Sequence, residues 1–255
     1  MNPDRARALQ ALNLRYLLKT GAFQFVDAHT PWFPYTSGQI GPYYVQSIAI
    51  EKEGDAYADA IQSLVELIRL KFGDFDVVSG GETRDWDFSN PVAVALRKPH
   101  IKLYKDGKTL GAEVNDRRVL HVADLNNEGS SIRDHWKPIL ERSGANLAGF
   151  VSYVDRLEEG LGVLQSLGLP FASVVPLDED AWNSACREGT VTADIRNILV
   201  DRFRDRHRWA RRTLMTHPEY FKQFASSPKT RDKALKIIRT YPDLAPDLNR
   251  MAGLA

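Results

Sequence analysis

Short apolar, β-branched runs alternate with helical stretches along the first part of the chain, up to about residue 178. The runs read FDVVSG, HIKLYK, RVLHVADL, LAGFVSYVD and FASVVPL. Strands that alternate with helices are typical of parallel βαβ units. After Gly189 the runs vanish, and helical stretches are broken by HPEY, SSPKT and YPDLAPD. The pattern predicts an α/β domain over residues 1–188, with a mostly parallel sheet flanked by helices, and an all-helical C-terminal extension over residues 189–255.

Length and composition limit the class of protein. The 255 residues, 43% of them hydrophobic, allow one sizeable core with an appendage or two small domains. No apolar run is long enough to cross a bilayer, and the first residues lack the charged head and apolar centre of a secretion signal, so we expect a cytoplasmic protein without membrane contact. The single cysteine, Cys186, excludes an internal disulfide and a thiolate metal cluster. We expect it to be a small, buried apolar side chain.

Charge is distributed unevenly, although the net charge is only +1. Residues 189–255 contain fourteen Lys and Arg against seven Asp and Glu, so the extension carries +7 and the rest of the chain −6. Its segment DRFRDRHRWARR places Arg204, Arg208, Arg211 and Arg212 on neighbouring helical positions around Trp209. Such a strip could follow a nucleic-acid backbone, with Trp209 stacking on a base. The alternative is that the strip docks on the acidic part of the chain or faces water.

The chain opens with a helical pattern over residues 3–19. Leu9, Leu12, Tyr16 and Leu17 fall on one face, and the pattern stops at Gly21. We expect this face to pack on the core or on a second subunit.

The stretch RVLHVADLNNEGSSI, residues 118–132, reads as a buried strand, a polar turn and the start of a helix. His121, inside the apolar strand, is expected to be a hydrogen-bonded core histidine. Gly129 allows close backbone approach, and Ser130 or Ser131 can cap the helix and donate a hydroxyl to an anion. Ligands of open α/β sheets lie beyond the carboxyl ends of the strands, where helix N-termini offer N–H groups. A phosphate cradle beside a hydroxyl-binding carboxylate is one interpretation, and an ordinary strand-to-helix turn is the other.

Five segments of the chain resemble the orotate phosphoribosyltransferase family, in that family's order. TSGQIGPYYVQ resembles its early hairpin segment, and FDVVSGGETRDWDFSNPVAVAL resembles its strand, pyrophosphate loop and helix. KLYKDGK is similar to a strand that ends in an Arg-Lys pair, VLHVADLNNEGSSI to the diphosphate-sugar signature, and VSYVDRLEEG to a later strand that ends in Asp-Arg. The resemblance implies the type I phosphoribosyltransferase fold, with helices flanking a mostly parallel sheet.

The same resemblance implies a reaction and its components. A phosphoribosyl group would pass from phosphoribosyl diphosphate to orotate or a related planar acid, as the base nitrogen displaces pyrophosphate from ribose C1. Mg²⁺ would enter with the diphosphate, with Asp124 as its protein ligand, and a homodimer is the expected assembly.

Site residues follow from the resemblance position by position. The catalytic set that it implies is Asp124, Lys105 and Lys108. The implied phosphate- and ribose-binding residues are Gly129, Ser130, Ser131, Gly81 and Arg84. The implied base-binding residues are Arg156, which would hold the orotate carboxylate, with Tyr43, Tyr44, Ser37 and Gly38 near the ring.

The chain departs from the family pattern at demanding positions. Ala123 replaces the first of two adjacent acidic residues, and Tyr104 replaces the Arg of the Arg-Lys pair. The family's Thr- and Gly-rich phosphate turn reads Asn126, Asn127 and Glu128 before the glycine. A carboxylate within a few ångströms of a phosphate costs on the order of a few kcal/mol, so Glu128 has to point away or be protonated. A Lys before the Ser-Gly of the hairpin is replaced by Thr36, and the family's long loop with catalytic Lys and His is short here, with Lys108 as its remnant.

The pyrophosphate loop carries acidic residues where an anion should bind. Glu82, Asp85 and Asp87 stand there, and Arg84 offsets one of the three. The carboxylates could bind a divalent cation or be solvated. Trp86 is either a stacking platform for a planar ligand or a plug over the sheet edge.

Two hypotheses remain. In the first, the protein is a phosphoribosyltransferase that uses the residues above. In the second, the fold has lost turnover and binds a nucleotide-like ligand or a partner in a regulatory role. For Arg156, the alternative to a ligand contact is a salt bridge to Asp155, Glu158 or Glu159.

Overall fold

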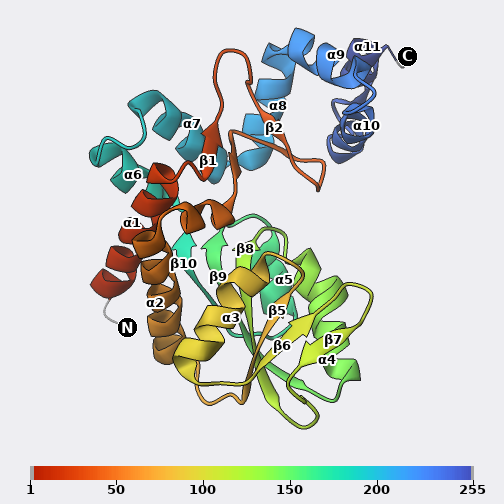
Figure 1. Cartoon of the computed structure of the whole chain (residues 1–255). Coiled ribbons are helices and arrows are strands. Elements are labelled where there is room, and N and C mark those ends of the chain that lie inside the picture. The colour runs from red at the N-terminus through yellow and green to blue at the C-terminus, as the bar shows by residue number, and fades with distance from the viewer. Residues whose placement is uncertain (1–2, 254–255) are drawn as a thin grey trace. The chain divides into compact units, whose positions relative to one another are not determined.

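The computed structural model describes residues 3–253, which form two compact units (Figure 1). The first unit contains residues up to 22 and residues 46–185, and the second contains residues 23–45 and 186 onward. Each is described by itself. No helix within residues 3–253 is both long and apolar enough to span a bilayer.

The first unit is built on a six-stranded sheet with the order β10-β9-β8-β5-β6-β7. Its strands are β5 (Val77–Gly81), β6 (His100–Leu103), β7 (Thr109–Gly111), β8 (Arg118–Asn126), β9 (Asn146–Asp155) and β10 (Phe171–Pro176). All neighbours pair in parallel except β6 and β7, which form an antiparallel hairpin. The predicted mostly parallel sheet is confirmed, because each β-branched run became a strand.

Helices cover both faces of this sheet (Figure 1). One face carries α1 (Pro3–Lys19), η1 (Ser47–Lys52), α2 (Gly54–Lys71) and α3 (Asp85–Leu96). The other carries the π-helical turn η2 (Ile132–Trp136), α4 (Lys137–Arg142) and α5 (Gly160–Ser166). Trp136, Ile139 and Leu164 pack there against Val119 and Phe150 of the strands, which forms the main core of the unit. The unit ends within α6 (Glu179–Arg187).

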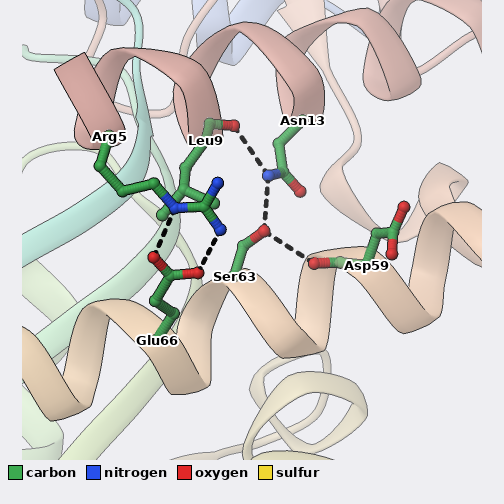
Figure 2. A network of polar contacts seen from close by, with 6 residues as sticks. All are labelled: Arg5, Leu9, Asn13, Asp59, Ser63 and Glu66. Atoms are coloured by element: carbon green, nitrogen blue, oxygen red, sulfur yellow. Dashed lines mark hydrogen bonds and ion pairs between the residues drawn. The ribbon is translucent and has the colours of Figure 1, made fainter.

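Helix α1 has the predicted bounds and packs on α2 and β10, so its apolar face belongs to the core of its own chain. Leu9 and Leu17 are buried, as predicted, but so is the polar Asn13. Figure 2 shows that the Asn13 amide donates to the Leu9 carbonyl oxygen at 2.8 Å and to Ser63 Oγ at 2.9 Å, while Ser63 donates to the Asp59 carbonyl oxygen. At the helix start, both guanidinium contacts from Arg5 to Glu66 measure 2.6 Å. Polar bonds thus fix α1 on α2.

The second unit combines two small two-stranded sheets with five helices. The sheets pair β1 (Phe23–Phe25) with β4 (Tyr43–Val45) and β2 (Phe33–Pro34) with β3 (Ile40–Gly41). The helices are α7 (Ala193–Arg204), α8 (Arg206–Thr216), α9 (Pro218–Ser226), α10 (Arg231–Thr240) and α11 (Ala245–Ala252).

The core of the second unit corrects the predicted domain boundary. Trp32 and Ile40, from the early segment, are fully buried together with Trp209, Phe221 and other apolar residues of α8–α11. The rings of Trp32 and Tyr220 meet edge to face, with 4.9 Å between centroids. Residues 23–45 therefore belong with the C-terminal helices, and a division at residue 188 separates groups that share one core.

The basic strip, which runs from the end of α7 along α8, does not offer the predicted stacking surface. Trp209 is 3% exposed and lies in the core, which rules out its stacking on a nucleic-acid base. Arg208 pairs with Asp201 at 3.2 Å, Arg212 pairs with the same carboxylate, and Arg211 pairs with Asp243 at 3.1 Å. The strip is thus partly neutralised by acidic residues of its own unit.

Two isolated predictions can be compared with the structure. His121 is buried and bonded to Ser79, as predicted for a core histidine. Cys186 is a free thiol that is only half-buried, so the prediction of a fully buried side chain was wrong.

Candidate functional site

The strand order places a crevice between β5 and β8. From β5 the chain proceeds to β6 on one side and to β8, β9 and β10 on the other, so the order reverses between β5 and β8. Ligands of open α/β sheets bind outside the carboxyl ends of the strands at such a reversal. The pairing of β5 with β8 ends at Ser79 and His121, and the strands separate beyond it. Asp124 follows on β8 at this point.

Asp124 is held from two directions. Its side-chain Oδ2 accepts a hydrogen bond from the Ser47 hydroxyl at 2.6 Å, and its backbone N–H donates to Asp85 Oδ1 at 3.0 Å. Burial, and next the negative charge of Asp85, raise the pKa of Asp124 to about 7, although the Ser47 hydrogen bond and Arg84 act in the opposite direction. Near neutral pH this carboxyl is therefore partly protonated, and it can donate as well as accept a hydrogen bond.

The stability of the first unit should depend on pH through Asp124. Its pKa rises from 3.8 in the unfolded chain to about 7 in the folded one, so the folded state binds the proton more tightly. The resulting stabilisation is fully present below about pH 4 and is lost as the pH rises through 7. Wild-type protein should lose on the order of 3 kcal/mol of unfolding free energy from this source between pH 4 and 8.

Urea unfolding of wild type and Asp124→Asn at pH 5 and pH 8 measures that dependence. The amide cannot titrate, so the variant should lose less stability than wild type over this interval. Equal losses in the two proteins would contradict the assigned direction.

The turn after β8 is tied to the end of β9. Asn126 donates to the Asp155 carboxylate at 3.0 Å, and the Gly160 N–H donates to the Asn127 carbonyl oxygen at 3.1 Å. Gly129 has a φ of +65°, and a Cβ there would approach Val163 of α5 at 3.0 Å. The glycine is therefore required by the backbone conformation and by packing on α5.

The serines and Glu128 of this turn have few bonds. Ser130 is half-buried and Ser131 is exposed, and the predicted side-chain cap of the helix is not formed. Within residues 3–253, the N–H groups of Glu128 and Gly129 have no hydrogen-bond acceptor. Glu128 is half-buried, and after Asp134 it helps to raise the pKa of Arg133. Its negative charge thus acts on Arg133, at the start of the following helix.

The predicted pyrophosphate turn lies at the end of β5. Gly81 is buried, and a Cβ there would come within 2.6 Å of the indole nitrogen of Trp136. Glu82 accepts the Lys105 backbone N–H at 2.9 Å, and the Arg84 side chain is exposed. The absence of a side chain at Gly81 thus leaves room for Trp136 of η2 to pack against β5. Sequence reasoning missed this packing role.

Trp86 packs as a plug and not as a free platform. Its Nε1 donates to the Gly80 carbonyl oxygen at 2.9 Å, and its ring meets Tyr104 edge to face at 5.0 Å. The Lys102 ammonium lies 5.1 Å from the Trp86 ring centre, and the Lys108 ammonium lies 5.5 Å from the Tyr104 ring centre. Trp86 covers the carboxyl end of β5. Tyr104, which stands where the resemblance implies an arginine, packs against the Trp86 ring instead.

Lys105 and Lys108 lie on a tight turn between β6 and β7. The Tyr104 N–H donates to the Lys108 carbonyl oxygen at 2.9 Å, which closes the hairpin. Both lysine side chains are exposed. A short hairpin therefore stands where the resemblance implies a long loop.

Arg156 follows β9 and is buried, with 7% exposure. Its Nη2 lies 3.6 Å from Glu158 Oε1, and both side chains are almost completely enclosed. The structure contains the salt bridge to Glu158 that was the alternative to a ligand contact.

The remaining predicted base-binding residues belong to the second unit. Gly38 has a φ of +91°, and a Cβ there would come within 2.9 Å of Lys236 on α10. Thr240 donates to the Ser37 carbonyl oxygen at 3.4 Å. Tyr43 is buried, whereas Tyr44 is 37% exposed. Helix α10 thus covers the Ser37-Gly38 turn.

The first unit brings together Asp124, Gly81 and Arg84 at the crevice, with Gly129, Ser130, Ser131 and Arg156 on the neighbouring strand ends. Sequence reasoning missed two residues at this crevice. Ser47 has no motif that marks it, and Asp85 was noted only as an acidic residue of a loop. Within residues 3–253, no group of three or more His, Cys, Asp or Glu side chains is arranged to hold a metal ion.

Comparison with known proteins relates this geometry to one family. The chain is 27% identical over 175 residues to an orotate phosphoribosyltransferase of Sulfolobus acidocaldarius, and this alignment covers 66% of this chain and 87% of the relative. It is 30% identical over 146 residues to the orotate phosphoribosyltransferase of Staphylothermus marinus, and that alignment covers 55% of this chain and 70% of the relative. The crystal structure of orotate phosphoribosyltransferase from Aeropyrum pernix superimposes with a TM-score of 0.60 at 22% identity, over 69% of this chain and 99% of that one. No family model matches the sequence.

Proposed function

The chain belongs to the orotate phosphoribosyltransferase family, and on that premise we propose that it transfers a phosphoribosyl group from phosphoribosyl diphosphate to orotate or a related planar acid. The base nitrogen forms a bond to ribose C1 and releases its proton. The C1–O bond to pyrophosphate breaks, and the electron pair leaves on the pyrophosphate oxygen, so that the pyrophosphate can take up the proton. The protein contributes by holding these groups in line and by offsetting their charge.

The observation that carries the proposal is the position of Asp124. It lies near the carboxyl end of β8, at the reversal of strand order, and is fixed by Ser47 and Asp85. In the proposed complex its carboxyl binds a ribose hydroxyl. Because the adjacent residue is Ala123, one carboxyl does the work of the family's two.

The phosphate groups are assigned to the two turns. The 5′-phosphate is proposed to bind at Gly129, Ser130 and Ser131, where N–H groups at a helix start favour an anion. The pyrophosphate is proposed to bind near Gly81 and Arg84, with the exposed ammonium groups of Lys105 and Lys108 offsetting its charge. Because Glu128 lies between Asn127 and Gly129, affinity for the 5′-phosphate should be low compared with a turn that lacks this carboxylate.

Mg²⁺ is proposed to arrive on the diphosphate and to be held mainly by substrate oxygens and water. Asp124 is its proposed protein ligand, and a partly protonated single carboxyl is a weak one. The residues fit an ion that the substrate brings and do not form a metal site of their own. The metal would supply charge neutralisation at the leaving group.

The carboxylate of the planar acid is assigned to Arg156 of the first unit. Tyr43, Tyr44, Ser37 and Gly38 belong to the second unit, and their part in base binding stays a prediction from the resemblance. Arg156 would have to exchange Glu158 for the acid's carboxylate. This ion pair is the observation that favours a second candidate function, in which the protein binds a nucleotide-like ligand in a regulatory role without turnover. A homodimer is part of both proposals.

The loss of orotate absorbance with phosphoribosyl diphosphate and Mg²⁺ tests the proposed function. Wild type should turn over, and Asp124→Asn should reduce kcat/KM by at least about 100-fold, within the range for a lost transition-state contact. Asp76→Asn is the matched control, since Asp76 Oδ2 accepts the Arg118 N–H at the opposite end of β8. Absence of turnover in folded wild type would reject the transferase and favour the second candidate, which calorimetry with nucleotides then tests.

A further inference from the structure

Asp85 joins two segments that the proposed site uses. It is the first residue of α3 and is 8% exposed. Its Oδ2 accepts the Gly81 N–H at 3.0 Å, and its Oδ1 accepts the Asp124 N–H at 3.0 Å. Gly81 begins the proposed pyrophosphate turn, and Asp124 begins the proposed ribose segment. One carboxylate therefore connects them across the gap where β5 and β8 separate.

The hydrogen bonds of Asp85 replace a missing part of the sheet. Pairing between β5 and β8 stops at Ser79 and His121, so the next N–H groups lack strand partners. A buried N–H without an acceptor costs about 1 to 3 kcal/mol. Asp85 supplies both acceptors, because each of its two carboxylate oxygens can accept a hydrogen bond. A side-chain amide at this position would offer only one acceptor oxygen.

A buried histidine, His121, lies next to the Asp85 carboxylate. His121 Nε2 lies 3.4 Å from Asp85 Oδ2, and Ser79 Oγ lies 3.0 Å from His121 Nδ1. The imidazole is stacked between Trp136 and Phe150, with centroid distances of 6.3 and 5.8 Å. The Ser79 contact and the two neighbouring rings hold the imidazole, whose Nε2 borders the Asp85 carboxylate without a hydrogen bond to it.

We propose that Asp85 is a positioning residue of the phosphoribosyl site, which fixes the spacing between the pyrophosphate turn at Gly81 and the ribose-binding carboxyl of Asp124. This inference rests on the proposed function. Asp85 does not touch the substrate, and it acts through the two backbone segments. His121 borders its carboxylate.

The spacing of the two segments gives the proposal a readout that a loss of packing alone would not change. If Asp85 sets the distance between Gly81 and Asp124, replacing it should lower kcat as well as raise KM.

Three variants test the role: Asp85→Asn, Asp85→Glu and the matched control Asp76→Asn. We expect Asp85→Asn to fold and to lower kcat/KM for phosphoribosyl diphosphate by at least tenfold, with a loss in kcat as well as a rise in KM. Asp85→Glu keeps both acceptor oxygens at a displaced position, so its loss in kcat/KM should be smaller than that of Asp85→Asn. Asp76→Asn should match wild type in both kcat and KM.

Two measurements separate this inference from the proposed function. Hydrogen exchange of the Gly81 and Asp124 amides should be at least tenfold faster in Asp85→Asn than in wild type, whether or not the protein turns over. Calorimetry should show at least tenfold weaker binding of phosphoribosyl diphosphate to Asp85→Asn than to Asp76→Asn. If wild type has no turnover but both changes occur, the transferase is rejected and the positioning role stands.

Other outcomes overturn the positioning role. Unchanged exchange of the Gly81 and Asp124 amides together with unchanged ligand affinity in Asp85→Asn would do so in an active or an inactive protein. If that variant does not fold, hydrogen exchange in wild type decides. The Gly81 and Asp124 amides should be protected as strongly as the β8 interior, and rapid exchange at both would show that Asp85 does not hold them.

Discussion

Gly81→Ala should destabilise the first unit by about 3 kcal/mol or more, because the added methyl group has no space. A Cβ at Gly81 would come within 2.6 Å of the indole nitrogen of Trp136, and both residues are buried. The strand cannot readily shift at this point, since Gly81 pairs with Leu103 of β6 and its N–H donates to Asp85. A decrease in the urea midpoint at constant m-value measures the loss.

Two further variants make this result specific. Gly73→Ala is the matched control, because no atom lies within 4 Å of a Cβ at Gly73. Combining Gly81→Ala with Trp136→Leu should cost less than the sum of the two single changes, because the smaller side chain makes room. Strict additivity, or equal midpoints for the two alanine variants, would show that Trp136 does not restrict the residue at position 81.

Trp32→Ala should destabilise the second unit by about 3 to 5 kcal/mol, the usual range for removing a buried tryptophan. Trp32 is fully buried and meets both Tyr220 and Phe224 edge to face, with centroids 4.9 and 5.0 Å away. The early segment should then separate from α9. Hydrogen exchange of the amides in residues 33–41 is the direct measurement, together with calorimetric unfolding.

Phe203→Ala provides the comparison within the same unit, since Phe203 is 41% exposed. It should change the unfolding temperature of the second unit little. If Trp32→Ala left exchange in residues 33–41 as slow as in wild type, the early segment would be held by something other than its aromatic core.

The sequence was most informative where structure depends on neighbours along the chain. Helix α1 begins and ends at the predicted residues because its apolar spacing and its stop near Gly21 are local signals. The β-branched runs became the parallel strands for the same reason. Asp124 could be picked out because it is the acidic residue near the end of one such run.

Local signals failed where distant residues decide. The segment around Trp32 has no sequence mark that associates it with α9 or α10, so its unit was assigned wrongly. Trp209 looked like a stacking residue because its helix is basic, but its burial depends on that distant segment. The part of Asp85 in the site depends on where β5 and β8 separate, and strand register of this kind cannot be read from one sequence.

The shared core of residues 23–45 and 186 onward has a consequence for how the protein is made. On the ribosome the early hairpins emerge long before helices α8 to α11 exist, whereas domains generally fold as units as they are completed. Until the last helices emerge, the ring of Trp32 has no partner and is exposed to solvent. The first unit, which is complete by Ala185, can form its sheet beforehand. The second core therefore closes after the first unit can fold, and chains that stop before helix α8 should be the ones chaperones retain.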